Sequence, residues 1–288
     1  MKLLKNPDPV SFQASIKEHL LLHEAENNLP LGILASLIAG EYRDQPPYLA
    51  QVVDHGEVKL VVMRTPPYPV LLSFEENQLD QEIIDLVNED LWKEFGDELS
   101  GMTGSKDLVS QFADSWQAVS GKMAILKMAM RIYKLERVSP VSGVSGSMRP
   151  AQDDDKGLLL DWIKGFYQDS MMDIPDPERI QRQAEKYLTS EPLLRGMMIW
   201  EAGIQPVSMA GYAGPTPNGI RVGAVYTPLA QRKKGYASAC VAGLSQYLLD
   251  LGFQFCFLFT DLMNPTSNHI YQQIGYQAVS DVDTFEFK

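Results

Sequence analysis

The sequence predicts an α/β protein of the layered α+β kind, with two domains that each carry a mixed, mainly antiparallel sheet flanked by helices. Its 288 residues, 45% of them hydrophobic, are enough to build two cores. Residues 139–147, SPVSGVSGS, form a small-residue stretch that suits a connector. In both halves, helical patterns alternate with short strand patterns. We therefore expect domains at residues 1–138 and 148–288, joined by a linker at residues 139–147.

The first half predicts helices around a hairpin, followed by a long strand. The hairpin is expected across Asp54, His55 and Gly56, between two runs rich in β-favouring residues. The small residues 100–105, SGMTGS, are typical of a loop that enters a helix. The expected helices cover residues 12–22, 24–39, 83–95 and 106–119, and the expected strands cover residues 48–53, 58–64 and 124–137.

The second half predicts two helices, an antiparallel meander, and then alternating helices and strands. Asp153 to Asp155 can cap the first helix, whose apolar residues recur at helical spacing. Asn218-Gly219 supplies the positive φ angles of a tight hairpin. Residues 253–260, FQFCFLFT, are apolar on both faces and predict a buried strand. The other expected elements are helices over 177–188, 237–251 and 267–274, strands over 197–201, 206–213 and 220–227, and a final strand or hairpin over 275–287.

Composition limits the classes of function. The formal charge of −12 argues against a general attraction to nucleic acid or to an anionic membrane. Cys240 and Cys256 lie in apolar patterns and indicate buried core residues, with no disulfide scaffold and no metal site. Pro7 and Pro9 interrupt the N-terminal sequence before a signal-type apolar core, and no run of a membrane-spanning length occurs. We expect a soluble cytoplasmic protein.

Residues 225–237, VYTPLAQRKKGYA, are the most informative stretch. A strand pattern ends at Pro228, and a basic loop containing glycine opens directly into a helix. Free backbone N–H groups and the positive end of the helix then point to one place, which favours a bound phosphate. In so acidic a chain, the cations Arg232, Lys233 and Lys234 indicate a local anion site, although a solvated charge run is the alternative.

The loop has Arg232, Gly235 and Ala237 in the pattern RxxGxA, and it resembles the acyl-CoA pyrophosphate loop of the GCN5-related N-acetyltransferases (GNAT). The resemblance covers residues 148–288 and includes the meander before the loop, the buried strand after it, and NPTSNHIYQQIGY at 264–276. The first half resembles a degenerate copy of the same fold, in which SGMTGS stands for the loop without its cations. The resemblance therefore implies two GNAT-like domains with one working site.

The resemblance also implies which residues meet acetyl-CoA. Backbone N–H groups of the loop would hold the pyrophosphate, and the strand before the loop would lie along the pantetheine with one N–H facing the thioester oxygen. Tyr271 would protonate the departing thiolate, although a helical tyrosine is more commonly a packing residue. The expected acetyl-CoA contacts are Val225, Tyr226, Thr227, Arg232, Lys233, Lys234, Gly235, Tyr236, Ala237, Ser238, Asn264 and Ser267.

Other motifs do not predict a site. Gly214 to Gly219 has the glycine spacing of a Walker loop, but Ile220 and Arg221 follow where lysine and serine or threonine are needed. His19 and His23, in HLLLH, lack the glutamate of a zinc-binding HExxH helix. No general base stands out, since the strand-end carboxylates Glu201, Asp261 and Glu286 are equally ordinary surface groups.

The expected function is transfer of an acyl group from acetyl-CoA to an amine, by direct attack in a ternary complex. The acceptor would be a small molecule or a peptide, and the protein would be a monomer or a homodimer, with no nucleic-acid, membrane or metal partner. The main alternative is a non-catalytic acyl-CoA-binding protein or sensor that uses the same loop. An interaction module that binds no cofactor is a third possibility.

Overall fold

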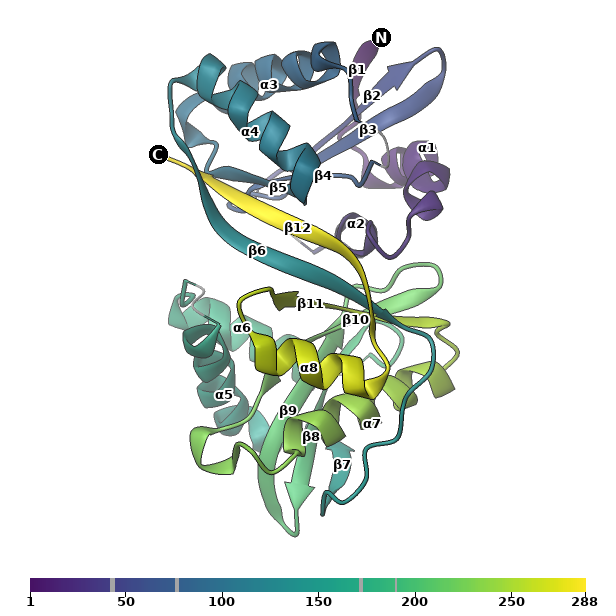
Figure 1. Ribbon diagram of the computed structural model, residues 1–288, viewed down its shortest axis with the longest axis vertical. Coiled ribbons are helices and arrows are strands. Elements are labelled where there is room, and N and C mark those ends of the chain that lie inside the picture. Colours follow the sequence, from purple (N-terminus) through teal and green to yellow (C-terminus); the bar gives the residue numbers. More distant parts are fainter. Residues whose placement is uncertain (42–44, 76–77, 171–172, 190) are drawn as a thin grey trace. The chain divides into compact units, whose positions relative to one another are not determined.

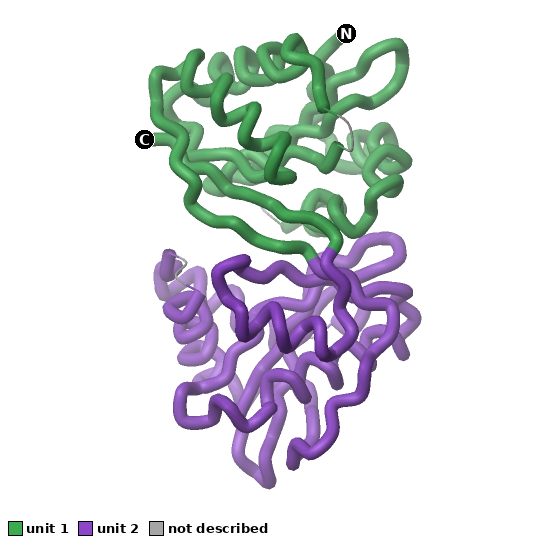
Figure 2. The backbone as a smooth tube through the Cα atoms, viewed as in Figure 1, with its two compact units in different colours: residues 1–132, 279–288 green, residues 133–278 purple. Residues whose placement is uncertain are grey.

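The computed structural model describes residues 1–41, 45–75, 78–170, 173–189 and 191–288. The chain divides into two compact units (Figure 2). Unit 1 contains residues 1–132 and 279–288, and unit 2 contains residues 133–278. The ranges differ from those expected in two ways. Residues 279–288 pack with the first half of the chain, and the boundary falls between residues 132 and 133, so the expected linker at 139–147 belongs to unit 2. The order of helices and strands is shown in Figure 1.

Unit 1 contains a mixed sheet in the strand order β1-β2-β3-β4-β5-β12-β6. Most neighbouring strands are antiparallel, and β4 and β5 are parallel. Its elements are β1 (Lys2–Lys5), α1 (Pro9–Leu22), α2 (Asn28–Ile38), β2 (Tyr48–Asp54), β3 (Glu57–Arg64), β4 (Val70–Leu72), α3 (Gln81–Phe95), β5 (Gly101–Ser105), α4 (Lys106–Ser120), and most of β6 (Ala124–Leu135) and β12 (Gln277–Phe287). The last residues of β6, 133–135, and the first of β12, 277–278, belong to unit 2.

The alternation of side chains along the strands places one apolar layer on each face of the unit 1 sheet. Ala50 and Val62 pack with α3 and α4, whereas Leu49, Val61 and Met63 pack with α1 and α2. The strands are therefore apolar on both faces, as expected for a sheet covered by helices on both sides (Figure 1).

Unit 2 repeats this plan with the strand order β11-β10-β9-β8-β7. The strands from β7 to β10 are antiparallel, and β10 and β11 are parallel. Helices α7 and α8 cover one apolar cluster, and α5 and α6 cover another. Its elements are β7 (Ser147–Pro150), α5 (Lys156–Asp169), α6 (Pro177–Leu188), β8 (Arg195–Ala202), β9 (Gln205–Ala213), β10 (Gly219–Tyr226), α7 (Tyr236–Asp250), β11 (Phe255–Asp261) and α8 (Pro265–Ile274).

The predicted fold class, mixed α/β with mainly antiparallel sheets flanked by helices, is confirmed. Some local predictions are wrong. Neither Asn218 nor Gly219 has a positive φ, and the positive φ in the connection before β10 is that of Gly214, at 69°. SGMTGS is not a loop, because residues 101–105 form the strand β5. A Cβ atom on Gly101 would lie 2.1 Å from the carbonyl oxygen of Phe285 on β12. The glycine therefore serves a close approach between strands.

The residues expected as a linker are held against unit 2. The backbone N–H of Ser139 donates to the carbonyl oxygen of Ile274 at 2.7 Å, and the Trp200 Nε1–H donates to the carbonyl oxygen of Ser145 at 3.1 Å. A Cβ atom on Gly146 would lie 2.1 Å from the carbonyl oxygen of Glu201. The small residues of this stretch therefore allow close packing along unit 2.

None of the described helices is both long and apolar enough to cross a membrane.

Candidate active site

The two parallel strands of unit 2 part from each other before they end. Pairing of β10 with β11 runs from Gly219 opposite Phe255 to Arg221 opposite Phe257. β10 then continues to Tyr226 and β11 to Asp261 without further pairing between them. The backbone of the second half of β10 is thus available on its β11 side, as expected for a strand that lies along pantetheine.

A bulge in β10 reinforces this separation. The register with β9 shifts between Gly223 and Tyr226, and Ala224 has a φ of 49°. Val222 and Val225 face the α7 cluster, whereas Ala224 and Tyr226 face the α5–α6 cluster. The extra residue reverses the alternation of side chains and re-aims the backbone N–H groups at this end of the strand.

Side chains at the end of β10 have packing roles. The Tyr226 ring lies against α5. A Cβ atom on Gly165 would lie 2.6 Å from Cζ of Tyr226, and the ring centroids of Tyr226 and Trp162 are 6.1 Å apart. The Thr227 hydroxyl lies 2.8 Å from the Ser208 hydroxyl. Contacts of Tyr226 and Thr227 with a cofactor stay a prediction.

The start of α7 has the geometry of an anion site. Gly235 is the N-cap residue with a φ of 80°, and no side chain caps the helix. The first intrahelical bond of this turn runs from the Ala239 N–H to the Gly235 carbonyl oxygen at 3.0 Å. The N–H groups of Tyr236, Ala237 and Ser238 precede it and have no helical acceptor, so they can hold phosphate oxygens.

Gly235 is required here for two independent reasons. Its φ lies in the left-handed region that side-chain-bearing residues rarely adopt. A Cβ atom at this position would also lie 2.7 Å from Cγ2 of Val144. Val144 belongs to the stretch expected as a linker, so sequence reasoning missed this contact. Only its small-residue composition could have suggested close packing.

The three cations of the loop are not equivalent. The Arg232 Nε–H donates to the Thr227 carbonyl oxygen at 2.9 Å, and its guanidinium pairs with Asp169. Lys234 donates to the Gln231 side chain at 2.9 Å and to the Ala230 carbonyl oxygen. Lys233 is exposed, with a φ of 64°, and makes no hydrogen bond or ion pair with any described residue. Arg232 and Lys234 brace the loop, and Lys233 is the cation available to an anion.

Asn264 and Ser267 meet at the start of α8. The Asn264 Oδ1 accepts the backbone N–H of Ser267 at 3.0 Å, and Pro265 occupies the first helical position. This capping bond holds the start of the helix that carries Tyr271. The cap accounts for the side-chain oxygen of Asn264, and contact of either residue with a cofactor stays a prediction.

Tyr271 lies in a cluster of three tyrosines. Its ring centroid is 6.4 Å from that of Tyr133 and 6.0 Å from that of Tyr276. The Tyr133 hydroxyl donates to Asn268 at 3.0 Å, and the Tyr276 hydroxyl lies 2.8 Å from that of Ser245. The Tyr271 side chain is partly buried, and its hydroxyl has no hydrogen-bond partner within the described part of the chain. Burial raises the pKa of Tyr271 to about 12, so its phenol is protonated at neutral pH and can donate a proton.

The strand-end carboxylates considered as general bases have other partners. Glu201 accepts from Arg149 at 2.8 Å, and Arg149 also pairs with Asp155. Asp261 accepts the backbone N–H of Met263 at 2.8 Å. Glu286 lies in unit 1 and pairs with Lys288 at 2.9 Å. Neither the sequence nor these contacts single out a base.

The alternatives set aside from sequence find structural explanations. His19 Nε2 lies 2.8 Å from a carboxylate oxygen of Glu75, and the described residues contain no group of side chains that could hold a metal ion. Gly214 precedes the turn between β9 and β10, where the Thr216 N–H donates to the Gly219 carbonyl oxygen at 2.7 Å. Cys240 and Cys256 are buried, and burial raises the pKa of each thiol to about 12. The prediction of core cysteines is confirmed.

Comparison with known proteins agrees with this geometry. Residues 159–276 match the model of the acetyltransferase (GNAT) family. The whole chain resembles a GCN5-related N-acetyltransferase from Sphaerobacter thermophilus, with a TM-score of 0.65 and 12% identity over 99% of this chain and 95% of that one. It also resembles a GCN5-related N-acetyltransferase from Kribbella flavida, with a TM-score of 0.62 and 14% identity over 90% of this chain and 95% of that one.

A further structural relative is a tandem GNAT protein from the clavulanic acid biosynthesis pathway. It has a TM-score of 0.56 and 12% identity, over 100% of this chain and 98% of that one. No curated protein matches the chain by sequence. At identities this low, the structural similarity shows a shared fold alone, and it extends over both units.

Proposed function

We propose that this chain, whose residues 159–276 match the acetyltransferase (GNAT) family, is an acetyl-CoA-dependent N-acetyltransferase that works by direct transfer in a ternary complex. The match to that family supports acyl transfer. The donor, the amine acceptor and the direct attack are the proposed parts. The separation of β10 from β11, followed along the chain by the uncapped start of α7, carries the proposal, because it offers a free strand edge and free N–H groups that could hold an anion.

The loop and α7 would bind the donor. The N–H groups of Tyr236, Ala237 and Ser238 would receive pyrophosphate oxygens, and Lys233 would add a charge that has no partner in the described part of the chain. Gly235 lets the backbone approach the phosphates closely. Arg232 and Lys234 would hold the shape of the loop through their bonds to its own residues.

The bulged end of β10 would orient the acyl group. Pantetheine amides would pair with the edge left free beyond Arg221, and a backbone N–H near Val225 would polarise the thioester carbonyl. The amine nitrogen bonds to the acyl carbon, the carbon–sulfur bond breaks, and sulfur leaves with the electron pair. Tyr271 would supply a proton to that sulfur, and water would receive the proton lost by the amine.

A non-catalytic acyl-CoA-binding protein or sensor is the alternative that uses the same loop. Two measurements separate the two functions. The first is calorimetric titration with acetyl-CoA, and the second is free-thiol release in the presence of polyamines, amino acids and peptides with free N-termini. Binding with thiol release supports the transferase. Binding without turnover on every amine favours the sensor, and no binding contradicts both.

A further inference from the structure

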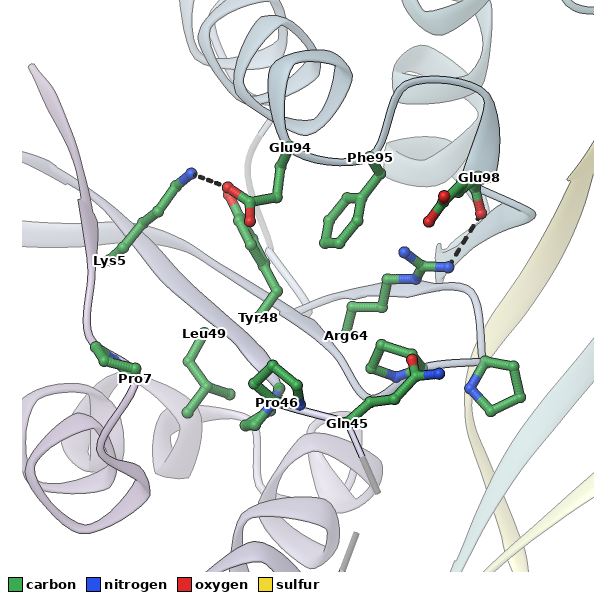
Figure 3. Close-up of a pocket in the computed structure, with 13 residues that line it drawn as sticks. Lys5, Pro7, Gln45, Pro46, Tyr48, Leu49, Arg64, Glu94, Phe95 and Glu98 are labelled. Atoms are coloured by element: carbon green, nitrogen blue, oxygen red, sulfur yellow. Dashed lines mark hydrogen bonds and ion pairs between the residues drawn. The ribbon is translucent and has the colours of Figure 1, made fainter. Parts of the chain in front are cut away.

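Unit 1 contains a pocket that the proposed transfer reaction does not use. Its volume is about 700 Å³, and it lies where β2 begins and where β3 and α3 end (Figure 3). This size is within the range of small-molecule sites. All of its lining residues belong to unit 1, whereas the proposed acetyl-CoA contacts belong to unit 2.

A buried, incompletely neutralised cation lines this pocket. Arg64 is only 6% exposed, and no described carboxylate lies within 4.0 Å of its guanidinium. Its Nε–H donates to the Tyr68 carbonyl oxygen and its Nη2 to the Glu98 carbonyl oxygen, each at 3.1 Å. Nη1 makes no hydrogen bond with a described residue. Burying a charge without a counter-ion is costly, so the site favours an anion.

The other charges of the pocket restrict the anion. Lys5 is already paired with two carboxylates, Asp90 at 2.8 Å and Glu94 at 2.9 Å, which together outweigh its charge. Burial lowers the pKa of Arg64, and the negative charge of nearby Glu98 acts in the opposite direction. Since Arg64 is the one lining cation without a carboxylate partner among the described residues, and Glu98 repels negative charge, a monoanion fits better than a phosphate dianion.

The rest of the wall is mainly apolar and rich in proline. Five of the lining residues are prolines. The Phe95 ring lies 4.4 Å from the Arg64 guanidinium carbon, and Figure 3 shows these two side chains together in the pocket. Tyr48 adds a second ring, 5.4 Å from Phe95, with its hydroxyl donating to Asp90 at 2.7 Å. Such a wall receives flat or extended apolar groups with little loss of conformational entropy.

We infer that this pocket binds a small apolar monocarboxylate, with the carboxylate on Arg64 and the apolar body against Phe95 and the prolines. The site is separate from the acetyl-CoA contacts, so the inference stands or falls independently of the transferase activity.

Calorimetric titration of the full chain tests the class of ligand. The probes are indole-3-acetate, phenylacetate and hexanoate, each matched with its neutral amide, and inorganic phosphate. At least one acid should bind with one site per chain, about tenfold or more tightly than its amide, because the amide loses the charged hydrogen bond. Equal binding of acid and amide, tighter binding of phosphate, or no binding of any acid would overturn the inference.

Two variants test the residue. Arg64→Gln should weaken binding of the acid about tenfold or more. Lys93→Gln removes the same charge at a site that is 74% exposed and outside the pocket, and should leave binding unchanged.

Glu98→Gln keeps the backbone bond to Arg64, and should tighten binding about two- to fivefold by removing a repulsive charge. It provides the test if Arg64→Gln does not fold. Equal affinities of the first two variants, or weaker binding by Glu98→Gln, would contradict the assignment.

Discussion

The start of α7 in unit 2 and the start of α3 in unit 1 occupy the same place in the same fold. Each helix connects two parallel strands, β10 to β11 in unit 2 and β4 to β5 in unit 1. Before α7 the chain has Arg232, Lys233, Lys234 and Gly235, and the first turn has no carboxylate. Before α3 the sequence is SFEENQLD, and Glu82 lies in the first turn. The residues at the start of α7 favour an anion there, whereas the start of α3 already carries negative charge.

This comparison corrects the location of the degenerate loop. SGMTGS was expected to be the counterpart of the phosphate loop, but it forms β5, which is the counterpart of β11. The counterpart in the topology is residues 73–80. Two of its described residues have structural partners, since the Phe74 N–H donates to Asn27 at 2.8 Å and Glu75 accepts from the Ser73 hydroxyl at 3.2 Å. A shared topology therefore does not imply a shared function, because anion binding depends on the residues of the loop.

The largest expected effect concerns Tyr271. Tyr271→Phe should lower kcat about 100-fold with little change in acetyl-CoA affinity, because a general acid acts only on the leaving group. Tyr133→Phe is the matched control in the same cluster, where the hydroxyl is already bonded to Asn268. Steady-state kinetics and calorimetry measure both quantities. Equal losses in the two variants would show that Tyr271 only packs.

The next effect concerns the cations of the loop. Lys233→Glu should raise the Kd for acetyl-CoA about tenfold at low salt, by placing a like charge beside the pyrophosphate, and less at high salt. Lys234→Glu should have a smaller effect, because Lys234 is directed to Gln231 and Ala230. Calorimetry at two salt concentrations measures this. A larger effect at Lys234 would reverse the roles assigned to the two lysines.

A smaller effect concerns the stability of unit 1, with no effect on acetyl-CoA. Asp283 on β12 is 4% exposed, its Oδ1 has no hydrogen bond, and burial raises its pKa. A raised folded pKa means that ionisation costs stability as pH rises through it. Asp283→Asn should therefore raise Tm by about 2–4 °C at pH 7 and by less near pH 4.

Asp281, two residues earlier, provides the control of opposite sign. It accepts from Arg131 at 2.6 Å, and that bond lowers its pKa. Its stabilising contribution is present above its unfolded pKa and is lost as pH falls through the folded value. Asp281→Asn should lower Tm at pH 7. Thermal melts that shift in the same direction for both variants would contradict these assignments.

The last prediction is that a change at the start of α3 has no effect on acetyl-CoA binding. Asp80→Lys removes the carboxylate at the start of α3, and acetyl-CoA should still bind once per chain with unchanged affinity. This change does not supply the separated strand end or the glycine turn on which the proposed acetyl-CoA site of unit 2 depends. A second calorimetric site in the wild-type chain, or its loss in this variant, would show that unit 1 also binds acetyl-CoA.

Local patterns predicted most elements and the chemistry of one loop. The helix expected over residues 177–188 is α6, and the helix expected over 83–95 is α3, starting at Gln81. Periodicity reveals helices because it is local to the chain. The strands β4 and β5 were missed, since the first has three residues and the second is rich in glycine.

Features that depend on distant parts of the chain were not visible in the sequence. The pairing of β12 with β5 and the contact of Val144 with Gly235 are of this kind. Within the site, the sequence identified the basic loop, but not that Lys233 alone of its three cations has no partner in the described structure. Rotamers and pairings of that kind depend on packing that no local pattern records.

The position of β12 makes unit 1 depend on the order of synthesis. Residues 279–288 pair with β5 and place Phe287 in the core around Trp116, with ring centroids 5.2 Å apart. A ribosome makes these residues only after the whole of unit 2. The earlier part of unit 1 must therefore wait, with one edge of β5 unpaired, while the later unit is translated. The half of the molecule that is made first is the half that is completed last.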